Sequence, residues 1–442
     1  MIIKELIENI REEKPKCLPD RERGVYKATK PKLLVAHPQT KTKFISKTSK
    51  VMAVSIASRW RELSGENNWE GLLLHPLDPD FRRYIIHYGE RTMAVGDLLD
   101  NDNSDHLHSL YAEQVFFTGA ALQNNNIFKY VVTHFFETAS NANESAWMGY
   151  VAVSTDEAKV GLGRRDILVA WRGTATEAEW ACNINFSQTS PSQLFGADND
   201  AKVHSGFLSL YTGTNSKTPF SARQQVLKAV RELVDKYRGE EISITVTGHS
   251  LGAALATLNA MDIVANGYNK STGSSTLSAG CLVTAFPYAS PRVGNDGLKQ
   301  LFDTFQDRRR LRLLRITNAH DVVPMVPFDN FIWPYTHLGH ELKIDSSKSG
   351  YLKSEVKGAP PSNVSETERS GTILWSAHNL DLHLHALALD QTGFGLEVDH
   401  DVALVNKYLD ALKDDYKIPP RWWDKGNRSN MVQMDNGHWK CV

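Results

Sequence analysis

One segment of this 442-residue chain restricts its possible folds more than any other: a strand joined to a helix through a serine flanked by glycines. Residues 242–246 alternate as a strand does, and residues 251–264 form an Ala-rich helical pattern that closes at Asn266-Gly267. Between them, Gly248-His249-Ser250-Leu251-Gly252 matches G-x-S-x-G. The glycines let strand and helix pass closely, and the tight turn exposes the hydroxyl of Ser250 at a helix N-terminus, which favours negative charge. The segment therefore predicts a nucleophilic serine.

Apolar runs and helical patterns alternate along much of the chain. Four further runs are predicted as buried strands, namely residues 150–153, 167–171, 282–286 and 311–317. Residues 221–237 are predicted as a helix with a Ser221–Gln224 capping box, and residues 401–412 as an amphipathic helix that faces the core. We therefore expect an α/β protein of the α/β-hydrolase type, with a mostly parallel sheet and helices on both faces.

Charge and cysteine usage exclude several classes of function. Lys+Arg 50 and Asp+Glu 51 leave a formal net charge of −1, which gives no reason to expect a nucleic acid partner. The four cysteines lie far apart without a CxxC pair, which favours reduced thiols over zinc or a disulfide framework. The apolar stretches are too short for a transmembrane segment, so we expect peripheral membrane contact and a cytoplasmic location.

The N-terminal residues differ in composition from the rest. No acidic residue occurs between Lys27 and Arg61, while Lys, Ser and Thr are common. Residues 1–51 are predicted to be a poorly ordered extension, with a plastid-targeting segment as the alternative. Residues 52–420 are predicted to form the catalytic domain, and residues 421–442 a tail that packs back through Trp422-Trp423.

A serine hydroxyl needs a base, and that base needs an orienting carboxylate. In this fold the carboxylate follows the serine along the chain, and Asp321 lies on the loop just after the strand at 311–317. Asp296 is the nearest rival, but Gly294-Asn295-Asp296-Gly297 is typical of a turn. His320 is the sequence neighbour of Asp321, and neighbours on a loop rarely face each other correctly.

The base comes from a segment with three histidines. We choose His378, with His385 as the alternative; His383 lies between them. His383 and His385 are two residues apart, which on a helix points them to different sides, so a metal site is not favoured. For the oxyanion hole, one backbone N–H is expected from Leu251 and the other from Thr174, in Trp171-Arg172-Gly173-Thr174.

With these residues the chain resembles the plant class II phospholipases A1, within the class 3 (fungal-type) lipases. The resemblance extends over nearly everything after Met52, and the segments that carry it are 63–69, 147–153, 163–174, 203–207, 246–255, 290–295 and those around Asp321 and His378. It implies a Ser250–Asp321–His378 triad and release of the sn-1 acyl chain of glycerolipids. It also implies a lid at about 175–185 that contains Trp180. Where the family usually has an aromatic residue, this chain has His383.

The predicted function is a phospholipase A1-type acylhydrolase that acts on a glycerolipid at a membrane or micelle surface without a cofactor. Within the same family, galactolipid and triacylglycerol are alternative substrates. A non-catalytic, lipase-like signalling protein and a soluble esterase are the rival classes. The complete set of triad residues favours the enzyme over the signalling protein.

Overall fold

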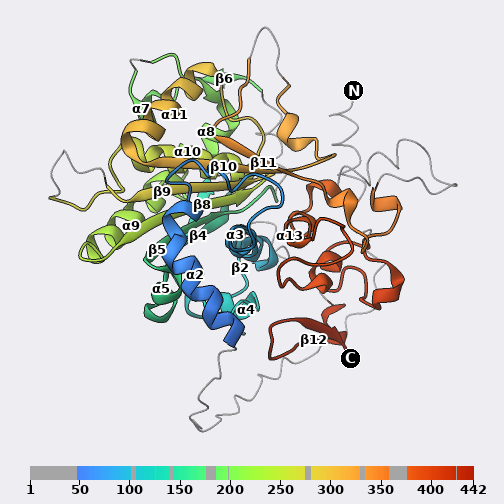
Figure 1. Ribbon diagram of the computed structural model, residues 1–442. Coiled ribbons are helices and arrows are strands. Elements are labelled where there is room, and N and C mark those ends of the chain that lie inside the picture. The colour runs from blue at the N-terminus through green and yellow to red at the C-terminus, as the bar shows by residue number, and fades with distance from the viewer. Residues whose placement is uncertain are drawn as a thin grey trace, which may run out of the picture.

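A mixed sheet forms the centre of the protein. The computed structural model describes residues 47–442 apart from 101–105, 125, 140–143, 176–185, 198, 274–279, 329–333, 358–375 and 425. In that part of the chain, nine strands form one sheet in the order β1-β2-β4-β5-β8-β9-β10-β11, with β3 also paired to β4 (Figure 1). The strands are β1 (Leu99–Asp100), β2 (His106–Ser109), β3 (Tyr130–Ala139), β4 (Ser145–Ser154), β5 (Arg165–Trp171), β8 (Ile242–His249), β9 (Leu282–Tyr288), β10 (Leu311–Asn318) and β11 (His340–Ile344).

The direction of the strands determines where a site can form. β5, β8, β9, β10 and β11 run parallel, while β3, β4 and β5 pair antiparallel. The carboxyl ends of the five parallel strands therefore meet at one edge of the sheet. The five predicted strand segments all lie within β4, β5, β8, β9 and β10, and the mostly parallel sheet is confirmed.

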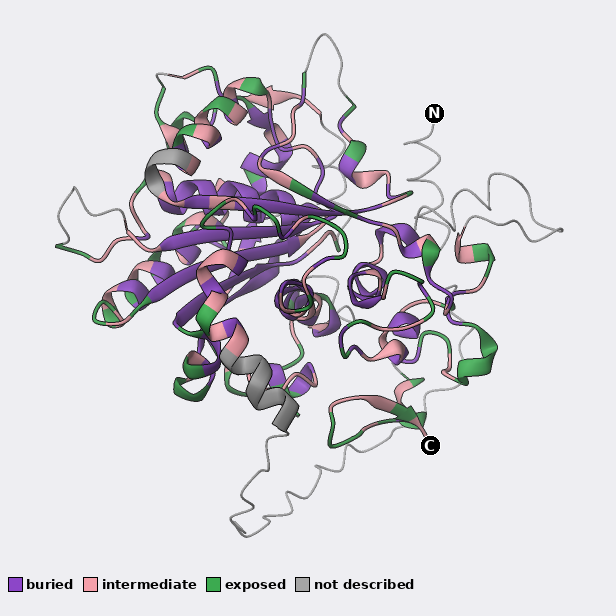
Figure 2. Ribbon diagram, in the orientation of Figure 1, coloured by how far each residue is buried: buried purple, intermediate pink, exposed green. Residues whose placement is uncertain are grey.

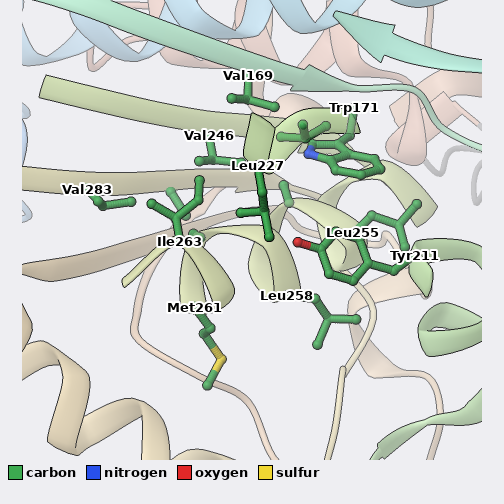
Figure 3. Packing of buried hydrophobic residues seen from close by; sticks show 14 of the residues in the cluster. Val169, Trp171, Tyr211, Leu227, Val246, Leu255, Leu258, Met261, Ile263 and Val283 are labelled. Carbon is green, nitrogen blue, oxygen red and sulfur yellow. The ribbon is translucent and has the colours of Figure 1, made fainter. Parts of the chain in front are cut away.

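One face of the sheet is covered by α9 (Ala222–Lys236), α10 (Leu251–Ala265) and α11 (Asp296–Arg309). The predicted capping box at the start of α9 is present, with Ser221 and Gln224 each bonding the other's backbone. Figure 3 shows Leu255 and Ile263 of α10 packed with Val169, Val246 and Val283 of the strands. α10 is buried nearly all round, which explains its mostly apolar sequence.

The opposite face is covered by α2 (Lys47–Leu63), α3 (Pro79–Asp97) and α13 (Leu380–Ala388). Figure 2 shows that the strands between the two helical layers are buried. This second core is rich in aromatic side chains, and Tyr88 of α3 stacks on Phe286 of β9 with ring centroids 5.4 Å apart. Helices therefore cover both faces, as expected for this architecture.

The structure corrects the helix predicted over residues 401–412. Only a short 3-10 helix, Val402–Asn406, forms there. The side-chain oxygen of Asn406 accepts hydrogen bonds from the backbone N–H groups of Ala411 and Leu412, at 2.8 and 2.9 Å, which turns the chain back on itself. The apolar side chains of Val405 and Leu412 are buried, but in a compact turn. The prediction for residues 401–412 was therefore correct about the burial of these side chains and wrong about the helical backbone.

The ends of the described chain also bear on the predicted boundaries. α2 begins at Lys47, within the segment predicted to be an extension, and residues 1–46 lie outside the described residues. At the other end, Trp422 is buried and donates from Nε1 to the carbonyl of Ala403 at 2.8 Å. A hairpin of β12 (Met431–Gln433) and β13 (Trp439–Cys441) follows. Among the described helices, none has the length and apolar character needed to cross a bilayer.

Candidate active site

Ser250 lies in the tight turn between β8 and α10. Its backbone angles are φ 57° and ψ −125°, in a region that a residue with a side chain rarely adopts. A Cβ on Gly248 would lie 2.2 Å from the carbonyl oxygen of Gly252, and a Cβ on Gly252 would lie 2.4 Å from that of Trp171. Both motif glycines are therefore required sterically, as the sequence predicts, and they hold Ser250 in its strained conformation.

Asp321 follows β10 at the same edge of the sheet. Its side chain is fully buried, and Oδ1 accepts a hydrogen bond from the backbone N–H of Val323 at 2.9 Å. The carboxylate also contacts His378, whose Nδ1 lies 3.1 Å from Oδ1 and 3.0 Å from Oδ2. The structure thus brings together two predicted site residues that are 57 positions apart in sequence.

His378 directly precedes the N-cap of α13, Asn379. The adjacent backbone is held by Asn318, the last residue of β10, whose Nδ2 donates to the carbonyl of Ala377 at 2.8 Å and to Oγ of Ser346 at 2.8 Å. The side chain of His378 is 10% exposed, so the ring is enclosed but accessible. With Nδ1–H bound to the carboxylate, Nε2 is the nitrogen left to accept a proton.

The other two histidines of the segment have different surroundings. His383 donates from Nδ1 to the carbonyl of Asn379 at 2.9 Å, and its Nε2 lies 3.9 Å from Asp321 Oδ2, beyond hydrogen-bond distance. Nε2 of His385 contacts Oγ of Ser349 at 2.8 Å. Burial lowers the pKa of each of these imidazoles to about 4, so both are neutral at pH 7. The geometry favours His378 over the alternative, His385, as the partner of Asp321.

His249 is a site residue that the sequence analysis did not single out. Its ring packs against that of His378, with centroids 4.6 Å apart, and its Nε2–H donates to the backbone carbonyl of His378 at 2.8 Å. Burial, and then the charges of His378 and His383, hold the pKa of His249 well below its usual range. A neutral imidazole next to Ser250 in sequence therefore holds the backbone and the ring of His378 in place. The only sequence signal for His249 was its position next to Ser250 in G-x-S-x-G, and the motif does not specify which residue type stands at an x position.

The two residues predicted to form the oxyanion hole belong to segments that adjoin Ser250. Leu251 is the first residue of α10, where backbone N–H groups lack partners within the helix. A Cβ on Gly173 would lie 3.7 Å from Cβ of Ser250, so the turn that precedes Thr174 passes directly beside Ser250. Arg172 anchors this turn, donating from Nε to the carbonyl of Trp147 at 2.9 Å. Of the lid predicted at about residues 175–185, residues 176–185, which include Trp180, lie outside the described residues.

The remaining rivals are placed elsewhere. Asp296 begins α11 and accepts a hydrogen bond from the hydroxyl of Thr336, as expected of a turn residue. His320 is exposed and has φ 71°. Within the described ranges, no group of three or more His, Cys, Asp or Glu side chains is arranged to hold a metal ion.

Comparison with known proteins identifies the family. The class 3 lipase family model matches residues 168–331. Phospholipase A1-II 6 of Oryza sativa subsp. japonica is 44% identical, over 87% of this chain and 95% of its own length. Phospholipase A1-IIgamma of Arabidopsis thaliana is 39% identical, over 89% and 94% respectively. The solved LIP2 lipase of Yarrowia lipolytica aligns with a TM-score of 0.42 at 20% identity, over 61% of this chain and 81% of that one. The chain therefore belongs to the class 3 lipases, together with the phospholipases A1-II, and is a serine ester hydrolase.

Proposed function

We propose that this protein cleaves the sn-1 acyl ester of glycerolipids through a Ser250–His378–Asp321 acyl-enzyme mechanism. The observation that carries the proposal is the hydrogen-bonded pair of His378 and Asp321, at 3.0 Å, next to the strained turn of Ser250. The relatives that match along most of the chain bear the name phospholipase A1, which supports the choice of the sn-1 ester.

The first half of the reaction forms the acyl-enzyme. His378 Nε2 takes the hydroxyl proton of Ser250 while Oγ bonds to the ester carbonyl carbon, and Asp321 stabilises the imidazolium. The backbone N–H groups of Leu251 and Thr174 donate to the oxyanion. When the tetrahedral intermediate collapses, the bond to the glycerol oxygen breaks, and His378 gives its proton to that oxygen.

The second half releases the fatty acid. His378 takes a proton from water while the water oxygen bonds to the acyl carbon, and the same N–H groups stabilise the second oxyanion. The bond to Ser250 Oγ then breaks, and His378 returns the proton to that oxygen. The products are a lysolipid and a fatty acid, and no step of this mechanism uses a metal or an organic cofactor.

Two exposed apolar side chains that follow Asp321 along the chain support action at a lipid surface. The chain after Asp321 forms a short 3-10 helix, Val323–Met325, and continues to Phe328. The side chains of Met325 and Phe328 are 53% and 45% exposed. Large apolar side chains exposed next to a catalytic site favour contact with lipid over contact with water alone. We therefore expect peripheral binding at a membrane or micelle surface.

Covalent labelling combined with lipid hydrolysis tests the proposal. Ser250→Ala should abolish labelling by a fluorophosphonate, whereas Ser209→Ala, an exposed serine on α8 (Ser205–Thr212), should label like the wild type. Phosphatidylcholine with different acyl chains at sn-1 and sn-2 should release the sn-1 chain. Labelling that persists in Ser250→Ala would overturn the nucleophile, and release of the sn-2 chain alone would overturn the positional assignment.

A further inference from the structure

A cavity lies away from the proposed catalytic residues. It has a volume of about 1060 Å³ and is lined by α3, the start of α13, the segment before β3 and the C-terminal hairpin. Neither Ser250 nor Asp321 nor His378 lines it. Its size reaches that of cavities that bind small molecules, roughly 300–1,000 Å³. It is therefore large enough for an organic ligand.

The lining of this cavity is strongly acidic. Its two formal cations are Arg83 and Lys407, and each is ion-paired to one of the carboxylates, Arg83 to Asp80 and Lys407 to Asp97. Burial lowers the pKa of His400 to about 3, which keeps that imidazole neutral. The lining also contains six carboxyl groups, which belong to Asp80, Glu90, Asp97, Asp381, Asp399 and Asp401. The lining therefore contains four more carboxyl groups than Lys and Arg side chains.

Two buried polar groups of the lining have no hydrogen-bond partner among the described residues: Oδ2 of Asp381 and Nε2 of His400. The two residues are only 2% and 4% exposed. Asp401, by contrast, accepts hydrogen bonds from the backbone N–H groups of Ala403 and Trp439, at 3.0 and 2.6 Å. Because a buried polar atom without a hydrogen-bond partner costs about 1–3 kcal/mol, and more when it is charged, these two atoms indicate a missing partner.

The titration of the carboxyl groups agrees with a missing cation. Burial, followed by the charges of Asp97 and Glu90, raises the pKa of Asp381 to about 7, although Lys407 opposes the shift. The pKa of Glu90 is also raised, again chiefly by burial. A positive charge in the cavity would favour the ionised form of both groups.

We propose that this cavity binds a linear organic polycation of the polyamine class, with one ammonium group bound to Asp381 and His400 and another near Asp399. Two features select this chemistry. The carboxylates are distributed around the cavity, and in the described part of the chain no three of them converge as metal ligands. An ionised carboxylate and the lone pair of a neutral imidazole both accept hydrogen bonds, so a cation bound to these two groups must carry N–H donors, which a quaternary ammonium lacks.

Isothermal titration calorimetry on the full chain tests the proposal, with spermidine as the probe at fixed ionic strength. Wild-type protein should bind spermidine saturably, and choline at least tenfold more weakly. Asp381→Asn should weaken spermidine binding at least tenfold. Asp303→Asn removes the same charge from α11, on the opposite face of the sheet, and should bind like the wild type.

Three outcomes would overturn the proposal. These are the absence of saturable spermidine binding, equal binding by Asp381→Asn and wild type, and saturable calcium binding that depends on Asp381 while spermidine does not bind. Thermal unfolding of each variant establishes that it is folded. If Asp381→Asn does not fold, Asp399→Asn replaces it, because that side chain is 82% exposed, and the same tenfold loss is expected.

Discussion

Two buried carboxylates near the start of α13 have opposite surroundings. Asp321 accepts hydrogen bonds from the backbone N–H of Val323 and from His378. Asp381, in the first turn of α13, has one oxygen without any hydrogen-bond partner in the described structure, and its pKa is raised to about 7. Both carboxylates are therefore buried, but Asp321 has a hydrogen-bond partner that Asp381 lacks. A carboxylate with its partners in place can orient a base, whereas one without them indicates a site that is completed by a ligand.

The largest expected effect concerns the carboxylate that has its partners. In Asp321→Asn the amide can present a donor to His378 Nδ1, which favours the wrong tautomer, and kcat should fall about 10⁴-fold. Hydrolysis of a dissolved short-chain ester measures this without a contribution from interface binding. Asp303→Asn, on an exposed helix, is the matched control and should retain wild-type kcat. A loss in Asp321→Asn of less than about tenfold would contradict the assigned role.

The second prediction concerns the steric restriction of the backbone in the turn between β8 and α10. Gly252→Ala places a Cβ 2.4 Å from the carbonyl oxygen of Trp171, so a strand end must move. The free energy of unfolding in urea should fall by about 3 kcal/mol.

Gly96→Ala is the control for that change, on the helix that lines the acidic cavity. No atom lies within 4 Å of its added Cβ, and this glycine is exposed. Its substitution should be neutral or stabilise the protein by up to about 1 kcal/mol. Equal losses of stability in the two variants would show that the catalytic turn is no more restricted than the surface of α3.

The third prediction concerns the carboxylate that lacks a partner. Because the pKa of Asp381 is raised from 3.8 to about 7, its contribution to stability is full below pH 3.8 and is lost as the pH rises through about 7. Asp381→Asn removes this dependence. Without ligand, the free energy of unfolding of the variant should rise relative to that of the wild type by about 2 kcal/mol as the pH increases from about 5.5 to 8. Urea unfolding at both pH values measures the gain, and a constant difference would refute the raised pKa.

The smallest expected effect concerns His249, which positions His378 through a backbone carbonyl 2.8 Å from its Nε2. His249→Phe keeps a ring against His378 but removes the hydrogen bond, so kcat should fall about tenfold with little change in KM. His249→Gln can still donate and should recover part of the rate. An unchanged kcat in His249→Phe would show that the ring packing alone positions His378.

Local patterns in the sequence predicted the elements that depend on neighbours along the chain. The strand, elbow and helix around Ser250 follow from steric rules at Gly248 and Gly252, and the Ser221–Gln224 capping box is confirmed. The helix predicted at 401–412 failed because Asn406 bonds its own downstream backbone, a contact that apolar periodicity does not reveal. The pairing of Asp321 with His378 was expected from the order of residues along the chain and from a family resemblance, since spacing alone leaves three histidines open.

The sequence by itself determined the fold class, the tight turn that carries Ser250 and the loop that carries Asp321, because propensity, turn sterics and strand order act over short distances. Only the tertiary structure decided which histidine meets that carboxylate, that His249 supports it, and that carboxylates from α3, α13 and the C-terminal region line one cavity. These features depend on how distant segments pack against a common sheet, and the burial that shifts a pKa exists only once that packing has formed.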